Sequence, residues 1–479
     1  MKLSELAKEL PQKIIKGEDA EIFSLCTDSR IVGKGDLFFC YRGTKSDSHR
    51  YAEEAVSRGA AAIVCERELP LSCPQLIVPD GRAAIAPVSA AFAGHPERKL
   101  KIIGVTGTNG KTTVTHILYN VLQEAGIPAG LIGTLGARYG KKSVAPALTT
   151  PDPDFLFPLL ADMLRAGVQV VAMEVSAHAL ALGKDAPIVY DVGVFTNFTQ
   201  DHLDFFGNMT AYGNAKKLMF SPKRCKFAVL NADDEFSMQL AKGVPSITYG
   251  LENPADCFAL VESETVCGSR AVLNFSDELC EAKIPLTGRH NLYNALAAGA
   301  AARRLGVGCE EIAKGLLATE RVDGRLERVA SFRGADIFVD FAHTPDGLEK
   351  SLLALKEHCG GRLILLFGCG GNRDRTKRPV MGETAARLCD FAVITSDNPR
   401  FEDPCAIISE IEAGYRKISK SYVAVEEREK ATEYALGLLQ KGDILLVAGK
   451  GGETYQEIMG IKYSYNDKAV IKNLLGTMK

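Results

Sequence analysis

The sequence predicts an α/β protein with three domains. Short apolar runs typical of buried strands alternate with helical patterns along the whole chain, which favours parallel sheets covered by helices. A polar, proline-containing segment at residues 94–98 interrupts the alternation, and a new series starts near residue 325. With 479 residues, the chain is also too long for one ordinary hydrophobic core. We therefore expect domains at residues 1–98, 99–324 and 325–479.

Each domain has its own predicted elements. In the N-terminal domain we expect a helix at residues 51–58 and buried strands at residues 36–40, 60–65 and 75–78. In the central domain we expect strands at residues 168–173 and 191–196 and an alanine-rich helix at 291–305. The C-terminal domain should contain strands at residues 337–339, 362–367, 391–395 and 444–448, with helices between them.

The strongest local signal lies at residues 102–113. An apolar, strand-like run enters a glycine-rich loop, and a helical pattern follows at residues 114–124. Glycines let backbone N–H groups approach phosphates, and the helix N-terminus adds positive potential. Lys111 would reach the terminal phosphates and Thr112 could hold Mg²⁺. Five residues separate Gly104 from Gly110, one more than in the standard loop, so we expect a variant phosphate loop on a P-loop ATPase-like parallel sheet.

The composition narrows the class of protein. A net charge of −2 gives no reason to expect a nucleic acid or a membrane surface as partner. There is no run of about 18 apolar residues, as a membrane-spanning helix would need, so no membrane insertion is expected. The 13 cysteines form no Cys-x-x-Cys pair, which fits free thiols in a reducing cytosol. The first residues resemble the start of an amphipathic helix rather than a signal peptide, and we expect a cytoplasmic protein.

Polar residues follow two strands of the central domain. Glu174 comes directly after the strand at 168–173, and His202 follows the strand at 191–196. Ligands of open α/β sheets gather at the carboxyl ends of strands, so both side chains could face the phosphate loop and complete a Mg²⁺ site. Taken singly, each has an equally good structural explanation, Glu174 as a helix N-terminal acid and His202 as a core or capping residue.

Two basic residues remain ambiguous from the residues alone. Lys216 lies in a helical stretch, where a solvated lysine is the simplest interpretation. Arg325 stands at the junction of the second and third domains, where it could swing onto a phosphate or form a surface pair with Glu327.

The C-terminal domain presents polar loops at the predicted ends of its strands. Asp340 and His343 follow the first of these strands and could meet the edge of a nucleotide. The glycine-rich segment 368–374, the segment 397–400 and the segment 449–453 follow later strands. Together they offer acids, an amide and two guanidinium groups, a mixture that suits a zwitterionic ligand. Ordinary solvated turns are the alternative.

These segments together resemble the Mur ligases, ATP-dependent enzymes that add amino acids to the UDP-muramoyl peptide of bacterial cell walls. The resemblance spans nearly the whole chain, and the motifs fall in family order. They are the phosphate loop at 106–112, Thr149-Thr150-Pro151, Glu174-Val175-Ser176-Ala177-His178, Asp201-His202-Leu203-Asp204, Gly288-Arg289-His290-Asn291 and Asp397-Asn398-Pro399-Arg400. The resemblance implies an N-terminal UDP-binding α/β domain, a central ATP-binding domain and a C-terminal Rossmann-like α/β domain that binds the amino acid.

The resemblance also implies roles for individual residues. Lys111, Lys216 and Arg325 would be catalytic. Metal contacts would come from Thr112, Glu174, His202 and Lys216, the last as a carbamylated lysine that supports a second Mg²⁺. The nucleotide contacts would be Gly107, Thr108, Asn109, Gly110, Lys111, Thr112, Thr113, Asn294, Arg325, Asp340 and His343. The UDP end would be held by Ser29, Thr44, Lys45 and Ser46, and the muramoyl peptide by Thr149, Thr150, Ser176 and Lys184.

The amino-acid site would consist of Arg373, Asp397, Asn398, Arg400, Gly449 and Glu453, and its segment 397–400 looks like the version that takes meso-diaminopimelate. This amino acid has a second carboxylate where lysine has none. Arg400 and Arg373 could bind that carboxylate in a bidentate manner, and Glu453 could take the adjacent ammonium. A pocket built for this carboxylate would leave a buried arginine unpaired with lysine.

Four positions differ from the family pattern. Gly452 stands where a histidine is usual, Ala177 replaces a second serine, and Leu182 and Lys184 stand where glutamine and arginine are common. Lys184 can still bind an anion, but as a point charge without the guanidinium fork. These changes concern substrate contacts and leave the ATP apparatus untouched.

The expected activity is therefore an ATP-dependent, ADP-forming ligation of meso-diaminopimelate to UDP-N-acetylmuramoyl-L-alanyl-D-glutamate through an acyl phosphate, in peptidoglycan synthesis and thus in cell shape and division. We expect a monomer. Three alternatives remain. The first is the same ligation with L-lysine, which Arg400 argues against. The second is a folylpolyglutamate-type ligase with the same phosphate loop, and the third is a P-loop protein whose nucleotide hydrolysis drives a partner.

Overall fold

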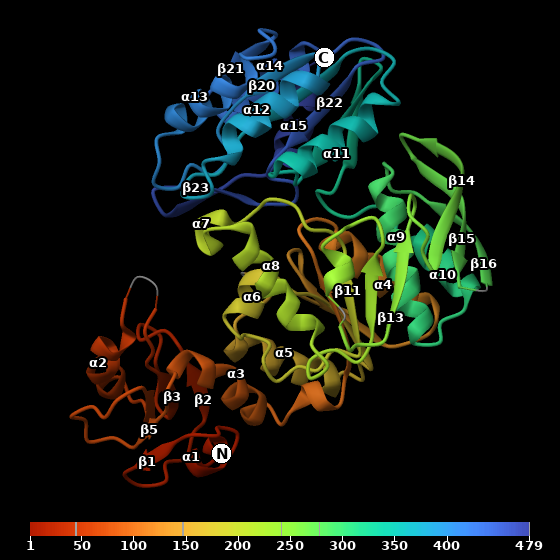
Figure 1. The fold of residues 1–479 in the computed structure, drawn as a ribbon. Helices are drawn as coiled ribbons and strands as arrows, with labels where there is room; N and C mark the ends of the chain where they lie inside the picture. Colours follow the sequence, from red (N-terminus) through yellow and green to blue (C-terminus); the bar gives the residue numbers. More distant parts are fainter. Residues whose placement is uncertain (44–45, 146–147, 241, 277, 479) are drawn as a thin grey trace.

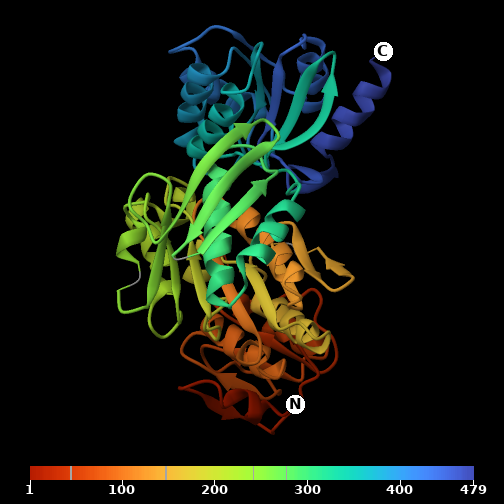
Figure 2. The ribbon, with the colours of Figure 1, turned by 90° about the vertical axis from the view of Figure 1, so that its right-hand side faces the viewer.

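The chain folds into three α/β domains. The computed structural model describes residues 1–43, 46–145, 148–240, 242–276 and 278–478. Figure 1 and Figure 2 both show the central domain between the N-terminal and C-terminal domains, with the two termini at opposite ends of the molecule. This arrangement confirms the predicted fold class. Thr44 and Lys45, two of the expected UDP contacts, lie outside the described residues.

The N-terminal domain is a five-stranded sheet of order β1-β5-β4-β3-β2, parallel except for β1. Its elements are α1 (Leu3–Ala7), β1 (Ile14–Lys16), β2 (Ser24–Cys26), β3 (Asp36–Phe39), α2 (Ala52–Ser57), β4 (Ala62–Cys65), β5 (Gln75–Ile77) and α3 (Gly81–Phe92), with 3-10 turns at Ser48–Tyr51 and Pro96–Arg98. The predicted helix and strands are present. All four residues of both β3 and β4 are buried, as expected of continuous apolar strands.

The central domain is organised around an eleven-stranded sheet of order β16-β15-β14-β13-β12-β11-β6-β10-β7-β8-β9. Its first half contains β6 (Lys101–Thr106), α4 (Lys111–Glu124), β7 (Ala129–Gly133), β8 (Gly136–Tyr139), β9 (Lys142–Val144), α5 (Pro153–Arg165), β10 (Val170–Glu174), α6 (Ala177–Ala181) and β11 (Val192–Phe195). Its second half contains α7 (Leu203–Phe206), α8 (Met209–Lys217), β12 (Ala228–Asn231), β13 (Ser246–Gly250), β14 (Cys257–Thr265), β15 (Gly268–Phe275), β16 (Glu278–Ile284), α9 (His290–Arg304) and α10 (Cys309–Ala318), with 3-10 turns at Leu218–Phe220 and Ser237–Gln239.

The central sheet has the predicted parallel strands at its centre and antiparallel strands at both edges. Its middle strands are parallel, but β8 and β9 at one end and β15 and β16 at the other run antiparallel to their neighbours. The continuous apolar strands that predicted the parallel part gave no indication of these edges. Strands β15 and β16 instead alternate between buried and more exposed residues, the pattern of an antiparallel sheet with one solvated face.

Helices cover both faces of the parallel part. Along β10, Val170 and Ala172 pack into a core with α4, α9 and α10, whereas Val171 and Met173 pack into a second core with α5. Successive strand residues point to opposite faces, so one apolar strand serves both cores. This packing fixes the carboxyl ends of β6, β10 and β11 side by side, because β6 pairs in parallel with both neighbours.

The C-terminal domain contains a six-stranded sheet of order β17-β18-β22-β19-β20-β21, parallel except for β17. Its elements are β17 (Glu327–Phe332), β18 (Ala335–Asp340), α11 (Pro345–Lys356), β19 (Leu363–Phe367), α12 (Lys377–Leu388), β20 (Phe391–Ile394), α13 (Pro404–Tyr415), β21 (Tyr422–Ala424), α14 (Arg428–Gly437), β22 (Ile444–Ala448), β23 (Tyr455–Ile458), β24 (Ile461–Ser464) and α15 (Asp467–Thr477). The four predicted strands are all present. Within the described ranges, no helix is long and apolar enough to cross a membrane.

Candidate functional site

The phosphate loop connects β6 to α4, and its shape depends on two glycines with positive φ. Gly107 has φ 146° and Gly110 has φ 88°, conformations that L side chains rarely adopt. A Cβ at Gly107 would lie 1.8 Å from Thr196 Oγ1. The loop is braced by the end of β11, where Thr196 Oγ1 donates to Asn109 O at 2.6 Å. Asn109 N in turn donates to the Asn197 side chain at 2.9 Å. The loop is therefore built into the sheet edge.

Lys111 lies over its own loop. Its Nζ donates to Gly107 O at 3.0 Å and to Thr108 O at 2.8 Å. Burial lowers the pKa of Lys111, while the carboxylates of Glu174 and Asp201 oppose that shift. An anion in the loop would offer the ammonium a stronger partner than these neutral carbonyls.

Thr112 and Glu174 are brought into direct contact although 62 positions separate them. Thr112 Oγ1 donates to Glu174 Oε2 at 3.0 Å, and Glu174 is completely buried. The second carboxylate oxygen accepts from Thr134 N at 2.8 Å. Thr134 Oγ1 also contacts Thr149 Oγ1 at 3.0 Å, which joins the expected metal contacts to the expected peptide contacts. A hydroxyl and a carboxylate are the hard oxygen donors that Mg²⁺ prefers.

Thr150 and Ser176 extend this group on the substrate side. Thr150 Oγ1 donates to the backbone oxygen of Glu174 at 2.9 Å and accepts from Ser176 N at 3.0 Å. The Ser176 hydroxyl caps α6 by accepting from Ala179 N. These contacts hold the two residues in place beside the carboxylate.

Lys216 is buried at the end of α8, contrary to the simplest interpretation of its sequence context. It is 1% exposed, and its Nζ donates to Gly107 O at 2.8 Å and lies 4.6 Å from the centre of the Tyr212 ring. Burial lowers the pKa of Lys216 well below its usual range, and the nearby charge of Lys111 lowers it further. Both effects favour the uncharged amine of Lys216 next to the phosphate loop.

His202 follows β11 and precedes α7, with a left-handed φ of 56°. Its Nε2 lies 3.3 Å from Asp201 Oδ2, and its ring meets His178 edge-on at 4.7 Å. Burial lowers the pKa of His202 to about 3, so the imidazole is neutral near pH 7 and able to bind a metal. Across the described residues, no three His, Cys, Asp or Glu side chains cluster as a metal site. The residues expected to bind Mg²⁺ can therefore form a site only if the Thr112 hydroxyl and a carbamate on Lys216 also supply oxygen ligands.

Asp201 links the central and C-terminal domains. Its carboxylate lies 3.7 Å from His343 Nε2 and 3.7 Å from Lys377 Nζ, both in the C-terminal domain. Burial raises the pKa of Asp201, but the hydrogen bond from His343 and the charge of Lys377 outweigh this and hold the pKa well below its usual range. Nearby, Gln200 donates to Asp374 at 3.2 Å. These contacts close one side of the junction.

Arg325 closes the other side. Its Nη2 donates to Thr112 Oγ1 at 2.9 Å, and its guanidinium stacks on Phe341 at 4.3 Å. Within the described part of the chain its buried Nε has no partner. Asp340 holds this junction, because its carboxylate accepts from the N–H groups of Leu326 and Ala342. The Asp340 carboxylate therefore holds the backbone at the junction of the central and C-terminal domains.

Asn294 lies at the far edge of the phosphate loop. Its side chain donates to Asn291 Oδ1 at 2.9 Å, and a Cβ at Gly110 would lie 2.6 Å from its oxygen. Asn109 in turn donates to Asp346 of the C-terminal domain at 2.8 Å. A nucleotide base at this edge would meet amide groups of the central domain and the Asp346 carboxylate of the C-terminal domain.

The expected amino-acid residues converge at the carboxyl ends of β20 and β22. Asn398 Nδ2 donates to Glu453 Oε2 at 2.9 Å. A Cβ at Gly449 would lie 2.6 Å from Asp397 Oδ2, so only glycine fits there. Lys450, which is completely buried, donates to Asn398 Oδ1 and to Glu453 Oε2, both at 3.0 Å.

The two expected carboxylate-binding arginines border this pocket. Arg400, with a left-handed φ of 53°, donates to Gly371 O at 2.8 Å and lies 3.2 Å from Glu457. Arg373 is half exposed and lies 3.7 Å from Asp204 of the central domain. Both guanidinium groups thus retain N–H donors beyond these contacts.

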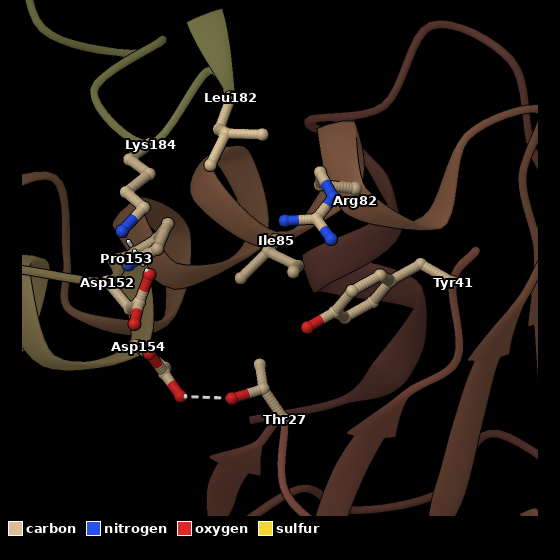
Figure 3. A pocket seen from close by; sticks show the side chains of 9 residues that line it. All are labelled: Thr27, Tyr41, Arg82, Ile85, Asp152, Pro153, Asp154, Leu182 and Lys184. Carbon is tan, nitrogen blue, oxygen red and sulfur yellow. Dashed lines mark hydrogen bonds and ion pairs between the residues drawn. The ribbon is translucent and has the colours of Figure 1, made fainter. Parts of the chain in front are cut away.

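A separate pocket lies between the N-terminal and central domains. Lys184 pairs with Asp152 at 2.7 Å on one side, and Thr27 donates to Asp154 at 2.9 Å. Figure 3 shows Arg82 over the Tyr41 ring on the opposite side, with 4.4 Å between guanidinium and ring centre. Of the residues expected at the UDP end, Ser29 is buried and Ser46 is exposed. The pocket joins the expected UDP side to the expected peptide side.

Comparison with known proteins identifies the family. The chain is 44% identical to the UDP-N-acetylmuramoyl-L-alanyl-D-glutamate--2,6-diaminopimelate ligase of Geobacillus thermodenitrificans, over 98% of this chain and 99% of that protein. The chain belongs to the Mur ligase family. It is also 41% identical to UDP-N-acetylmuramoyl-L-alanyl-D-glutamate--2,6-diaminopimelate ligase 1 of Clostridium acetobutylicum, over 99% of both chains.

Family models and a solved structure agree with this Mur ligase assignment. The model of the Mur ligase family catalytic domain matches residues 21–103, the middle-domain model matches 105–302, and the glutamate ligase domain model matches 324–451. A solved UDP-N-acetylmuramoyl-L-alanyl-D-glutamate--2,6-diaminopimelate ligase superimposes with a TM-score of 0.69 at 28% identity, covering 100% of this chain and 99% of the other.

Three residues of the candidate site could not be assigned from the sequence. Thr134 fixes Glu174, Lys377 faces Asp201 across the domain junction, and Lys450 pairs with Glu453 in the C-terminal pocket. Thr134 and Lys377 carry no sequence signal of their own, whereas Lys450 lies in the segment 449–453 that follows a predicted strand. Asn197, which directly follows the predicted strand at 191–196, fixes the phosphate loop.

Proposed function

We propose that this protein is an ATP-dependent ligase that adds meso-diaminopimelate to UDP-N-acetylmuramoyl-L-alanyl-D-glutamate in peptidoglycan synthesis. The observation that carries the proposal is the pocket of the C-terminal domain, where Asp397 and Glu453 lie around Lys450 and Arg400 lies 3.2 Å from Glu457. Such a mixture of acids and a guanidinium suits an amino acid with ammonium and carboxylate groups at both ends. The two relatives and the solved structure carry the name of this activity.

The phosphoryl transfer would take place at the phosphate loop. The γ-carboxylate of the D-glutamyl residue attacks the terminal phosphate of ATP, which gives an acyl phosphate and ADP. Lys111 and Arg325 supply positive charge on either side of Thr112 and stabilise the charge that develops on the phosphate oxygens. Mg²⁺ would neutralise phosphate charge when held by Thr112, Glu174, His202 and Lys216.

Lys216 would contribute oxygen ligands only after a covalent change. Its neutral amine attacks CO₂, a proton leaves, and the resulting carbamate is a carboxylate-like anion. The burial and lowered pKa of Lys216 favour the free amine that this reaction needs. The other contacts to the nucleotide would be Gly107, Thr108, Asn109, Gly110, Thr113, Asn294, Asp340 and His343.

The ligation itself needs no protein nucleophile. The amino group of meso-diaminopimelate attacks the acyl phosphate, and the tetrahedral intermediate collapses to the amide and inorganic phosphate. The substrate would extend from Ser29, Thr44, Lys45 and Ser46 at the UDP end to Thr149, Thr150, Ser176 and Lys184. Contacts of Asp201 and Arg325 across the domain junction would exclude water, which otherwise hydrolyses the acyl phosphate.

An amino-acid panel tests the proposal. Phosphate release from ATP is measured with the UDP-muramoyl dipeptide and meso-diaminopimelate, L-lysine or no amino acid. We expect rapid release only with meso-diaminopimelate, because Arg400 and Arg373 need its second carboxylate. A preference for L-lysine would overturn the amino-acid assignment. Dependence on a folate in place of the dipeptide, or rapid release with no acceptor at all, would overturn the ligation.

A further inference from the structure

Lys450 lies at the centre of the amino-acid pocket although the sequence analysis gave it no role. Its Nζ is completely buried and lies within 3.0 Å of Asn398 Oδ1, 3.0 Å of Glu453 Oε2 and 3.5 Å of Asp397 Oδ1. The rings of Tyr455 and Tyr465 lie 5.9 and 6.0 Å from this ammonium. One side chain therefore contacts three of the residues expected to hold the amino acid.

These contacts fix the orientation of Asn398. The amide oxygen accepts from Lys450 and also from Glu457 N at 2.9 Å. Because both bonds require the oxygen on that side, the amide nitrogen must face Glu453, to which it donates at 2.9 Å. Without Lys450, the amide oxygen of Asn398 would keep only the hydrogen bond from Glu457 N, and Glu453 would lose a charge-assisted hydrogen bond.

Lys450 also sets the charge of the pocket. Four carboxylates, those of Asp397, Glu453, Glu457 and Asp204, are paired with three cations, Lys450, Arg400 and Arg373, so Lys450 offsets part of the negative charge of the pocket. At neutral pH meso-diaminopimelate has two ammonium and two carboxylate groups and no net charge, whereas L-lysine has one net positive charge. Removal of Lys450 would leave an excess negative charge in a buried pocket, where charge interactions are stronger than in water.

We infer that Lys450 is a positioning and specificity-determining residue, which orients Asn398 and Glu453 and limits the negative charge of the pocket, so that a neutral diamino diacid is preferred over a cationic amino acid. The inference rests on the proposed function. The guanidinium groups of Arg400 and Arg373 attract the second carboxylate, and the Lys450 ammonium repels an extra positive charge. Both effects contribute to the discrimination between the two amino acids.

The test compares Lys450→Met and Lys450→Gln with the unmodified protein. Initial rates are measured with ATP and the UDP-muramoyl dipeptide while meso-diaminopimelate or L-lysine is varied. We expect the KM for meso-diaminopimelate to rise about ten-fold or more, with a smaller change in kcat and no change in the KM for ATP. The preference for meso-diaminopimelate over L-lysine in kcat/KM should fall by about ten-fold or more.

Lys462→Met is the matched control. Lys462 is exposed on β24, and its Nζ lies 4.2 Å from the same Tyr455 ring; it lies opposite Glu457 in the β23–β24 pair, but among the described residues it forms no ion pair with Asp397, Glu453 or Glu457. This variant should keep both the KM and the preference. Unchanged preference in a folded Lys450→Met or Lys450→Gln protein would overturn the inference, as would loss of the fold in both variants, since Lys450 would then serve folding alone. If the unmodified protein does not use meso-diaminopimelate, the proposed function itself fails.

Discussion

At the scale of single residues, the site works by placing basic groups where water cannot reach them. Lys111 and Lys216 both donate to the carbonyl oxygen of Gly107, from different parts of the chain. Two ammonium groups on one carbonyl would repel each other, and burial removes the solvation that would offset the repulsion. Burial is the main cause of the lowered pKa of each lysine, and the charge of Lys111 lowers the pKa of Lys216 further.

The role of Lys216 can be tested by chemical rescue. We expect Lys216→Ala to lower the ligation rate by about 100-fold or more, because a positioned anion in the active site is lost. Short carboxylic acids such as acetate should restore part of the rate by taking the place of the carbamate. The measurement is phosphate release with increasing acetate.

Lys217→Ala serves as the control for this experiment, since Lys217 is the neighbour on α8 and its ammonium lies 5.1 Å from the Phe236 ring. It should retain near-normal activity with no response to acetate. An inactive Lys216→Ala protein that no short acid rescues would argue against a carbamate.

His202 gives the protein a pH-dependent stability. Its pKa is about 3 in the folded protein and about 6.5 in an unfolded chain, so between these values the unfolded chain binds a proton that the folded protein does not. The free energy of unfolding therefore falls as the pH falls through this window. The His202→Gln protein should therefore gain stability relative to the unmodified protein as the pH falls from about 7.5 to about 5. Thermal unfolding at both pH values measures this, and an equal difference in Tm at both would contradict it.

At the scale of elements, the unit from β6 through the loop to α4 depends on backbone shape more than on side chains. Gly107 has a positive φ, and its neighbour across the loop is Thr196 on the adjoining strand end. Because β6 and β11 are hydrogen-bonded in parallel, the loop cannot move away from Thr196 without distorting the sheet.

We expect Gly107→Ala to lower ATP-dependent ligation by about 100-fold, since the added Cβ would lie 1.8 Å from Thr196 Oγ1 and push the N–H groups out of line. Gly94→Ala is the matched control, because Gly94 also has a positive φ of 76° but has no atom within 4 Å of the added Cβ. The control should lose only about 1–3 kcal/mol of stability through backbone strain and keep its KM for ATP. Equal kinetic effects of the two substitutions would contradict this account.

At the scale of the whole molecule, the active site exists only while the central and C-terminal domains are in contact. Gly324, with φ 62°, lies at the start of the junction and against the backbone of residues 451–452. The same segment carries Lys450 and Glu453, so it borders both the domain junction and the amino-acid pocket. The contacts of Arg325 and Asp201 complete the junction on either side.

Gly324→Ala should prevent this close approach, because the added Cβ would lie 2.0 Å from Gly452 N. We expect kcat/KM for meso-diaminopimelate to fall by about ten-fold or more as the pocket wall shifts. Small-angle scattering with ATP bound should show a larger radius of gyration than for the unmodified protein. Gly306→Ala, at a positive-φ glycine with open space around it, should leave both quantities unchanged. Normal kinetics in Gly324→Ala would contradict this link between the junction and the pocket.

The sequence by itself determined the local features of this protein. The strand, the glycines and the helix of the phosphate loop follow one another within about a dozen residues, so periodicity and backbone requirements alone reveal them. The same holds for the apolar strands, all of which are present, and for the polar segments at their carboxyl ends. The resemblance of the motifs to the Mur ligases then supplied the family, which the comparisons confirm.

Only the tertiary structure decided which distant groups meet and which are buried. The contact of Thr112 with Glu174, the burial of Lys216 and the central place of Lys450 each depend on packing between segments far apart in sequence. The antiparallel edges of the central sheet likewise depend on pairing partners rather than on strand composition. Local pattern fixes dihedral angles and periodicity, whereas desolvation and pairing are set by neighbours that only the folded chain provides.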